Sequence, residues 1–179
     1  MYVDILILSH LVVRPSHGYE IKKSVERILG SGFAMNNNLL YPALRRFEEM
    51  GAVEREIERQ EGKPDRHVYR ATELGAAILQ DMLREFPAQT AHNDAEFQTR
   101  VAFFGSLEPE DRLRILKTRE EVLKTRLEHL SKMSPKAQNS DERSYAERVI
   151  ELRRGQAQHE LEWIGELARE VKEQRPRVS

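Results

Sequence analysis

The chain has 179 residues, enough for one ordinary domain or for a small domain with an accessory one. It contains no cysteine, which excludes a disulfide framework, a thiolate nucleophile and zinc held by cysteine. Lys and Arg number 29 against 30 Asp and Glu, and the first 85 residues hold 12 against 13, so bulk charge gives no support for nucleic-acid binding.

The segment Tyr2–Val13 is apolar on most sides, which predicts a buried helix. A signal peptide is not favoured, because no basic residues precede the segment and it carries Asp4 and His10. No stretch of the sequence reaches the roughly 18 apolar residues that a membrane-spanning helix requires. We therefore expect a soluble, cytoplasmic protein with no membrane partner.

Two amphipathic helices are predicted next. The first spans about residues 19–29, between a break at 14–18 that contains Pro and Gly and the glycines of 30–32. The second begins at the three asparagines of 36–38, which are favoured N-caps, and ends at Gly51. Its expected buried face, spaced by four and three residues, consists of Leu40, Leu44 and Phe47.

A β-hairpin is predicted after these helices. Residues 53–60 alternate between two faces, and residues 67–72 form a stronger strand. Between them, 61–66 has the glycine, the proline and the charged residues that are typical of a turn. A fourth helix is expected from Thr72 through Leu83.

The remainder of the sequence indicates helices only. A short helix is expected around 97–104, a long one that restarts at 107–111 and ends at Ser134-Pro135, and a last one over about 141–172. The apolar band of the last helix is wide, so we expect it to need two partners, one from its own chain and one from elsewhere.

The predicted fold class is mainly α with a small β-hairpin. Three helices followed by a hairpin, all within about 75 residues, is the order of a winged helix-turn-helix, whose third helix enters the DNA major groove. We predict a winged helix-turn-helix DNA-binding domain over residues 1–86 and a helical dimerisation and effector domain over residues 87–179.

The third predicted helix is the expected reading surface. With its apolar face buried, the outward positions are Asn37, Asn38, Tyr41, Pro42, Arg45 and Arg46. Asn can pair with adenine and Arg with guanine, while a Tyr hydroxyl can bond a phosphate. Pro42 is expected to shape the start of the helix. The two arginines could instead be ordinary solvated residues, for example paired with Glu49.

Further DNA contacts are predicted outside this helix. The residues expected to meet phosphates near the second helix and the hairpin tip are Lys22, Lys23, Lys63, Arg66 and His67. The two lysines of the second helix could also be plain surface residues. Tyr69 is the last candidate for DNA contact, but the role that we favour for it is packing within the hairpin.

Three linked stretches resemble the PadR family of bacterial regulators: GYEIKK (18–23), LLYPALRRFEEMG (39–51) and EGKPDRHVYRATELG (61–75). The segments AEFQTRVAFFGSL (95–107) and ELEWIGELA (160–168) are similar to its longer subfamily, whose C-terminal domain has three helices. The resemblance implies a homodimer joined through C-terminal helices that binds a near-palindromic operator. The asparagines of 36–38 depart from the Ser, Thr or Gly often found there.

The resemblance also implies an effector site, because some relatives bind flat aromatic molecules beside the C-terminal helices. The residues that we predict for such a pocket are Phe104, Tyr145, His159 and Trp163. For Trp163, packing in the core or at a dimer interface is the alternative.

We therefore predict a ligand-responsive repressor with double-stranded operator DNA as its partner. The alternatives are a winged-helix module for protein–protein interaction and a transcriptional activator without a small-molecule effector. An enzyme is not expected, because the sequence has no Gly-rich phosphate loop, no G-x-S-x-G and no H-E-x-x-H. We also expect no cofactor and no metal site, because the histidines lack metal-ligand spacing.

Overall fold

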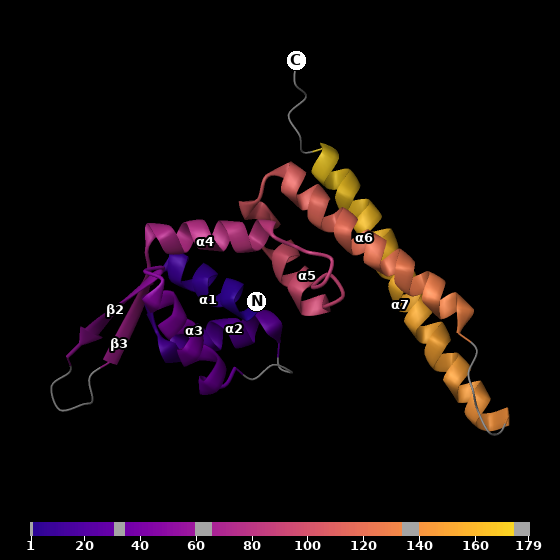
Figure 1. Cartoon of the computed structure of the whole chain (residues 1–179), viewed down its shortest axis with the longest axis horizontal. Helices are drawn as coiled ribbons and strands as arrows, with labels where there is room; N and C mark the ends of the chain where they lie inside the picture. The colour runs from indigo at the N-terminus through magenta and orange to yellow at the C-terminus, as the bar shows by residue number, and fades with distance from the viewer. Residues whose placement is uncertain (1, 31–34, 60–65, 134–139, 174–179) are drawn as a thin grey trace, which may run out of the picture. The chain divides into compact units, whose positions relative to one another are not determined.

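The computed structural model describes residues 2–30, 35–59, 66–133 and 140–173 (Figure 1). It confirms a mainly α-helical fold with a small sheet. Contacts divide the chain into two units, one of residues 1–85 and 98–106 and the other of 86–97 and 107–179. The domain boundary at residue 86 stays a prediction, and residues 98–106 group with the first unit.

The first unit is built around α1 (Tyr2–Val13). Its most deeply buried side chains, all without exposed surface, are Ile5, Leu6, Ile7 and Leu8. These four consecutive residues point in all directions around the helix axis, so the helix needs neighbours on every side. Helix α2 (Gly18–Leu29), helix α4 (Glu73–Arg84) and the third strand provide them (Figure 1).

Helix α3 (Asn37–Glu49) matches its predicted span. The side-chain oxygen of Asn36 accepts a hydrogen bond from the backbone N–H of Leu39 at 3.0 Å, so Asn36 is the N-cap. At the other end, Gly51 has φ +71°, a left-handed conformation that glycine adopts without strain. The predicted apolar face is confirmed, since Leu40, Leu44 and Phe47 are buried.

A three-stranded antiparallel sheet in the order β1-β3-β2 completes the winged fold. Strands β2 (Val53–Glu58) and β3 (Arg66–Ala71) form the predicted hairpin. Most of the turn expected at 61–66 lies outside the described residues. Strand β1 (Ser16–His17) was not predicted, because two residues are too few to show an alternating pattern.

Hydrogen bonds and a close backbone approach connect the segment after α3 to the start of α4. Thr72 caps α4 by accepting from the N–H of Gly75 at 3.1 Å, and its hydroxyl donates to the carbonyl of Gly51 at 2.8 Å. Gly75 lies so close to Ala52 that a Cβ would stand 2.1 Å from the Ala52 carbonyl oxygen. Only glycine fits at this position without a backbone shift.

Helix α5 (Asp94–Ala102) and the 3-10 helix η1 (Phe104–Ser106) follow. The later part of α5 belongs to the first unit, where the buried Arg100 donates to the carbonyls of Glu85 at 2.9 Å and Met82 at 3.2 Å. These bonds satisfy two carbonyl groups at the end of α4, where no backbone N–H of the helix remains to donate to them.

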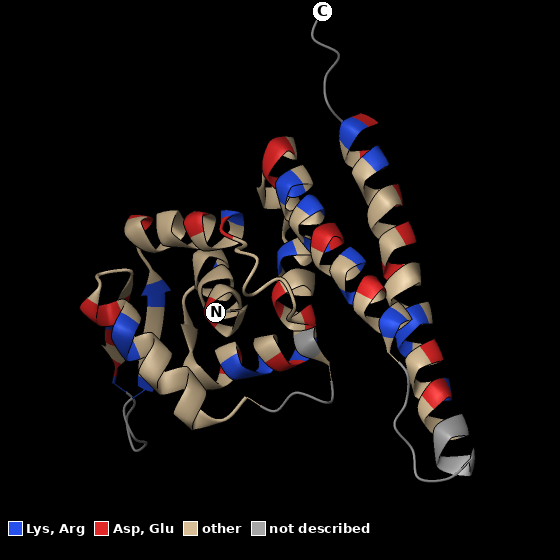
Figure 2. Ribbon diagram, turned by 45° about the vertical axis from the view of Figure 1, so that its right-hand side comes forward, with Lys and Arg blue, Asp and Glu red and all other residues tan. Residues whose placement is uncertain are grey.

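The second unit is dominated by a hairpin of two long helices, α6 (Pro109–Lys132) and α7 (Ser140–Glu173), which lie side by side (Figure 1). Buried apolar residues of α6 and α7 form the seam: Ile115, Leu116, Leu123, Leu130, Ala157, Ile164 and Val171. Basic and acidic residues are interspersed along both helices (Figure 2). Within the described residues, no helix is both long enough and apolar enough to cross a membrane.

We expect Gly75→Ala to lower the free energy of unfolding by roughly 1–3 kcal/mol, because the added methyl overlaps the Ala52 carbonyl. Urea denaturation measures this change. Gly165→Ala is the matched control: it lies within α7 with no atom within 4 Å of the added Cβ, so it should raise stability by up to about 1 kcal/mol. Equal effects of the two substitutions would contradict the close approach at Gly75.

We expect the protein to lose stability as the pH falls below 6.5, in part through His10. Burial lowers the pKa of His10 from 6.5, Arg14 lowers it further, and Glu20 opposes the shift. The unfolded chain therefore binds a proton at a pH where the folded chain does not, so unfolding becomes easier as the pH drops through this range.

The test compares the wild-type protein with His10→Gln, whose amide can still hydrogen-bond to the Ser16 hydroxyl that lies 2.9 Å from His10 Nε2. Urea denaturation between pH 7.5 and pH 5, roughly the range around an ordinary histidine pKa, should show a shallower loss for the variant. If the free energies of unfolding of the two proteins fall equally with pH, His10 does not contribute to the loss of stability.

Candidate nucleic-acid interface

The outward face of α3 is open, as the sequence predicts. Tyr41 is 45% exposed, and the asparagines at the start of the helix, Asn37 and Asn38, are exposed as well. A shallow hollow of about 410 Å³ runs along this face. Its lining consists of Asn37, Asn38, Tyr41, Pro42, Arg45, Arg46 and Glu49. Donors, acceptors and an aromatic hydroxyl are thus presented together along one face of α3.

The two adjacent arginines of α3 differ in their surroundings. Arg46 donates to the Asp4 carboxylate of α1 at 2.5 Å, and its guanidinium lies 5.4 Å from the centre of the Phe47 ring. Arg45 is exposed and has no hydrogen-bond or ion-pair partner among the described residues. Arg45 therefore has its donors available for a ligand, whereas Arg46 holds α3 against α1.

The negative charge of Glu48 on α3 is offset by an arginine of the neighbouring strand. Glu48 accepts from Arg55 Nε of β2 at 3.1 Å, which ties the helix to the sheet and offsets one negative charge. Among the described residues, neither Arg45 nor Arg46 forms the ion pair with Glu49 that was the alternative prediction.

A second hollow, of about 590 Å³, lies where α3 meets the start of α2 and the sheet. It is lined by His17, Gly18, Tyr19, Glu20, Tyr41, Arg66, His67 and Tyr69. The ring of Tyr41 closely approaches Gly18, where an added Cβ would stand 3.1 Å from the hydroxyl oxygen. Two predicted contact residues from β3, Arg66 and His67, therefore share one concave surface with Tyr41.

Hydrogen bonds fix the geometry of this second hollow. His17 donates through its backbone N–H to Glu20 at 3.0 Å, which caps α2. Its ring Nδ1 hydrogen-bonds to the carbonyl of His67 at 3.2 Å, and its Nε2 lies 3.5 Å from Glu58. The start of α2 is thus tied to both strands of the hairpin.

The predicted contact residues of α2, Lys22 and Lys23, do not line either hollow. Lys22 is half-buried on α2, and Lys23 is exposed with its ammonium 4.9 Å from the centre of the Tyr19 ring. Lys63 lies outside the described residues. Tyr69 is only 4% exposed, and burial, followed by the charge of Glu48, raises its pKa. This burial favours the packing role of Tyr69 over a DNA contact.

The four residues predicted for an effector pocket belong to two different units, so a pocket that joins them stays a prediction. Phe104 is buried in η1 of the first unit, whereas Tyr145, His159 and Trp163 belong to α7. Along the continuous helix α7, Tyr145 and Trp163 stand about 27 Å apart at 1.5 Å per residue. Trp163 instead meets Phe97 edge-on, with 6.3 Å between ring centres.

Metal binding has no structural support in the part of the chain that the structure describes, where no three His, Cys, Asp or Glu side chains gather closely enough to hold an ion. The candidate site is a surface of exposed hydrogen-bonding groups on α3, bordered at the base of the hairpin by a concave region that contains Arg66 and His67.

Comparison with known proteins matches residues 7–81 to the transcriptional regulator PadR-like family. A PadR family transcription regulator from Clostridium difficile R20291 is 32% identical, with 45% of this chain and 82% of that chain covered and a TM-score of 0.40. A transcriptional regulator from Clostridium thermocellum is 30% identical over 45% of this chain and 77% of its own, with a TM-score of 0.41.

A longer match is the Bacillus subtilis PadR solved in complex with operator DNA, which is 20% identical and covers 96% of this chain and 99% of its own, with a TM-score of 0.45. The matched family consists of transcriptional regulators, and the winged-helix fold of the first unit agrees with this match. The chain belongs to the PadR-like family, which confirms the resemblance seen in its sequence.

Proposed function

We propose that the chain binds double-stranded operator DNA by placing the N-terminal half of α3 in the major groove. The observation that carries this proposal is the exposed face of α3, on which Arg45 has no partner among the described residues. The major groove is wide enough for one helix, and there Arg pairs with guanine and Asn with adenine. Glu49, at the far end of the face, favours an approach by the start of the helix.

Phosphate contacts would flank this reading surface. Tyr41, Arg66 and His67 line the hollow beside α3, so a backbone phosphate near the base of the hairpin could meet all three. Lys22, Lys23 and Lys63 would add weaker, non-specific contacts, which makes binding strongly dependent on salt. We assign Arg46 an indirect role, since its bond to Asp4 sets the position of α3.

We also propose that the protein acts as a homodimer joined through α7. One side of α7 is buried against α6, but a second apolar stripe remains exposed. The exposed fractions are 71% for Tyr145, 49% for Val149, 61% for Leu152 and 40% for Trp163. An apolar stripe of this kind marks an interaction surface, and a second copy of the chain supplies a matching stripe.

Dimerisation would determine which operators fit. Two α3 helices related by a two-fold axis would read the half-sites of a near-palindromic operator about 34 Å, or one helical turn of DNA, apart. We propose a cytoplasmic repressor whose effector changes the pairing of the α7 helices and so the spacing of the reading helices.

We expect Arg45→Ala to weaken binding to the operator by roughly 5- to 150-fold, the loss of one bidentate contact to guanine. Fluorescence anisotropy with a labelled duplex from the promoter of the protein's own gene measures the affinity at several salt concentrations. Arg84→Ala, which removes an exposed arginine of α4, is the matched control and should change affinity little.

Unchanged affinity for Arg45→Ala would overturn the assignment of α3 as the reading helix. Equally weak binding of the wild-type protein to the promoter and to a scrambled duplex would instead favour the protein–protein interaction module.

We expect Leu152→Glu to convert the dimer into a monomer, because it places a charge within the exposed apolar stripe of α7. Sedimentation velocity at micromolar concentration measures the change. Gln158→Glu adds a charge to an exposed position outside the stripe and should leave the dimer intact. A monomeric wild-type protein, or a Leu152→Glu variant that sediments as the wild type does, would contradict the proposal.

A further inference from the structure

A cavity of about 580 Å³ opens in the second unit between α6 and α7, and its lining includes none of the residues predicted for an effector pocket. Three basic side chains line it: Arg126 and His129 from α6 and Arg153 from α7. The volume falls in the range of pockets that hold small organic ligands.

Neither of the two arginines of the cavity forms an ion pair with a described residue. The only bond of Arg126 among the described residues is a long one, 3.5 Å, to the carbonyl of His92. Arg153 is exposed and has no ion pair within the part of the chain that the structure describes. An anion in the cavity could therefore bind both guanidinium groups without displacing an internal partner.

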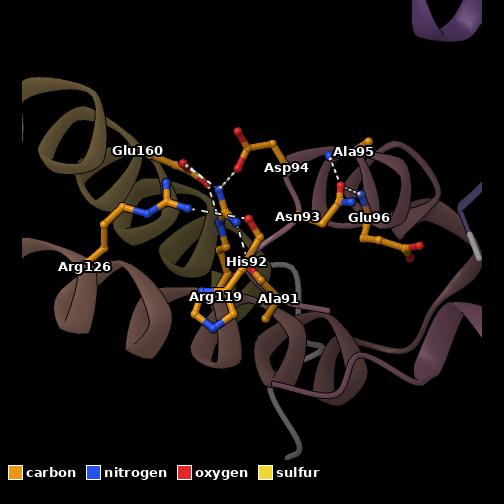
Figure 3. Close-up of polar contacts among 9 residues, drawn as sticks. All are labelled: Ala91, His92, Asn93, Asp94, Ala95, Glu96, Arg119, Arg126 and Glu160. Carbon is orange, nitrogen blue, oxygen red and sulfur yellow. Dashed lines mark hydrogen bonds and ion pairs between the residues drawn. The ribbon is translucent and has the colours of Figure 1, made fainter. Parts of the chain in front are cut away.

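The carboxylates at the cavity wall are already engaged. Figure 3 shows Arg119, whose side chain is 1% exposed, between Glu160 and Asp94. It donates to Glu160 at 2.7 and 2.9 Å and to Asp94 at 2.5 Å, and it also donates to the carbonyl of Ala91 at 2.6 Å. The charge of Arg119 neutralises one of these two carboxylates. The two charges of Arg126 and Arg153 exceed the single charge of the other carboxylate, so the cavity wall keeps a net positive charge.

Apolar residues supply the rest of the surface. Leu130 is 4% exposed and Ala157 is 2% exposed, so both form a fixed floor. Met133, at the end of α6, is 44% exposed at the mouth of the cavity, where its unbranched side chain can adapt to a ligand. Cationic and apolar surface thus face the same space.

We propose that this cavity binds a small organic anion, with its acid group on Arg126 and Arg153 and its apolar body against Leu130 and Met133. Because one arginine belongs to α6 and the other to α7, the bound anion ties the two helices together. The site does not depend on DNA binding, so it stands or fails separately from the proposed contact of α3 with DNA.

The probe for the test is 8-anilinonaphthalene-1-sulfonate, which joins one sulfonate to an apolar body and fluoresces when bound. Titration into the full-length protein should give saturable binding. N-phenyl-1-naphthylamine has the same apolar body without the sulfonate, so it should bind more weakly by about tenfold or more, the value of a charge-assisted hydrogen bond.

Two variants test the charge of the cavity. Arg126→Gln and Arg153→Gln each remove one cation that lines the cavity. Each should weaken binding of the sulfonate by about tenfold and leave binding of the neutral amine within about twofold. Gln158→Glu, an exposed residue of α7 that does not line the cavity, is the matched control and should bind like the wild type.

Far-UV circular dichroism of each variant checks that the helices are intact, and Arg153→Gln remains informative if Arg126→Gln misfolds. The proposal is overturned if the sulfonate shows no saturable binding, or if Arg153→Gln and Gln158→Glu bind it equally. It is also overturned if the neutral amine loses affinity in parallel with the sulfonate, since the effect would then reflect packing and not charge.

Discussion

The rest of the first unit depends on the burial of α1. Its four consecutive buried residues cannot be covered by one neighbour, so helices and sheet must surround it. The same helix carries Asp4, which holds Arg46 of α3 at 2.5 Å. The core helix thus adds one ion pair to the contacts of the candidate reading helix, which also packs against β2 and α2. The neighbouring Arg45 has no such partner among the described residues and faces solvent.

A different constraint governs the second unit, where Arg119 is buried. A buried cation is costly unless it is paired and hydrogen-bonded, and Arg119 meets this requirement through Glu160, Asp94 and a backbone carbonyl. These bonds join α6, α7 and the start of α5. They also use the acids of the neighbouring cavity, which is why that cavity presents unpaired positive charge.

Local periodicity predicted much of this structure from the sequence. The apolar spacing of Leu40, Leu44 and Phe47 located α3 and its exposed face, and the alternation near Tyr69 located the hairpin. Pairings between distant residues could not be predicted, because they depend on tertiary packing. The bond of Arg46 to Asp4 spans 42 positions, so the sequence could not distinguish Arg46 from Arg45. The two-residue strand β1 was missed for the same reason, since its partner β3 lies far along the chain.

The central claim is that Arg45 reads a guanine in the operator, and a double-mutant cycle with modified DNA tests it most directly. Replacing a contacted guanine by 7-deazaguanine removes the N7 acceptor that an arginine would use. The wild-type protein should lose affinity for one such duplex, whereas Arg45→Ala should bind the modified and unmodified duplexes equally. Equal losses for both proteins at every guanine of the operator would contradict the claim.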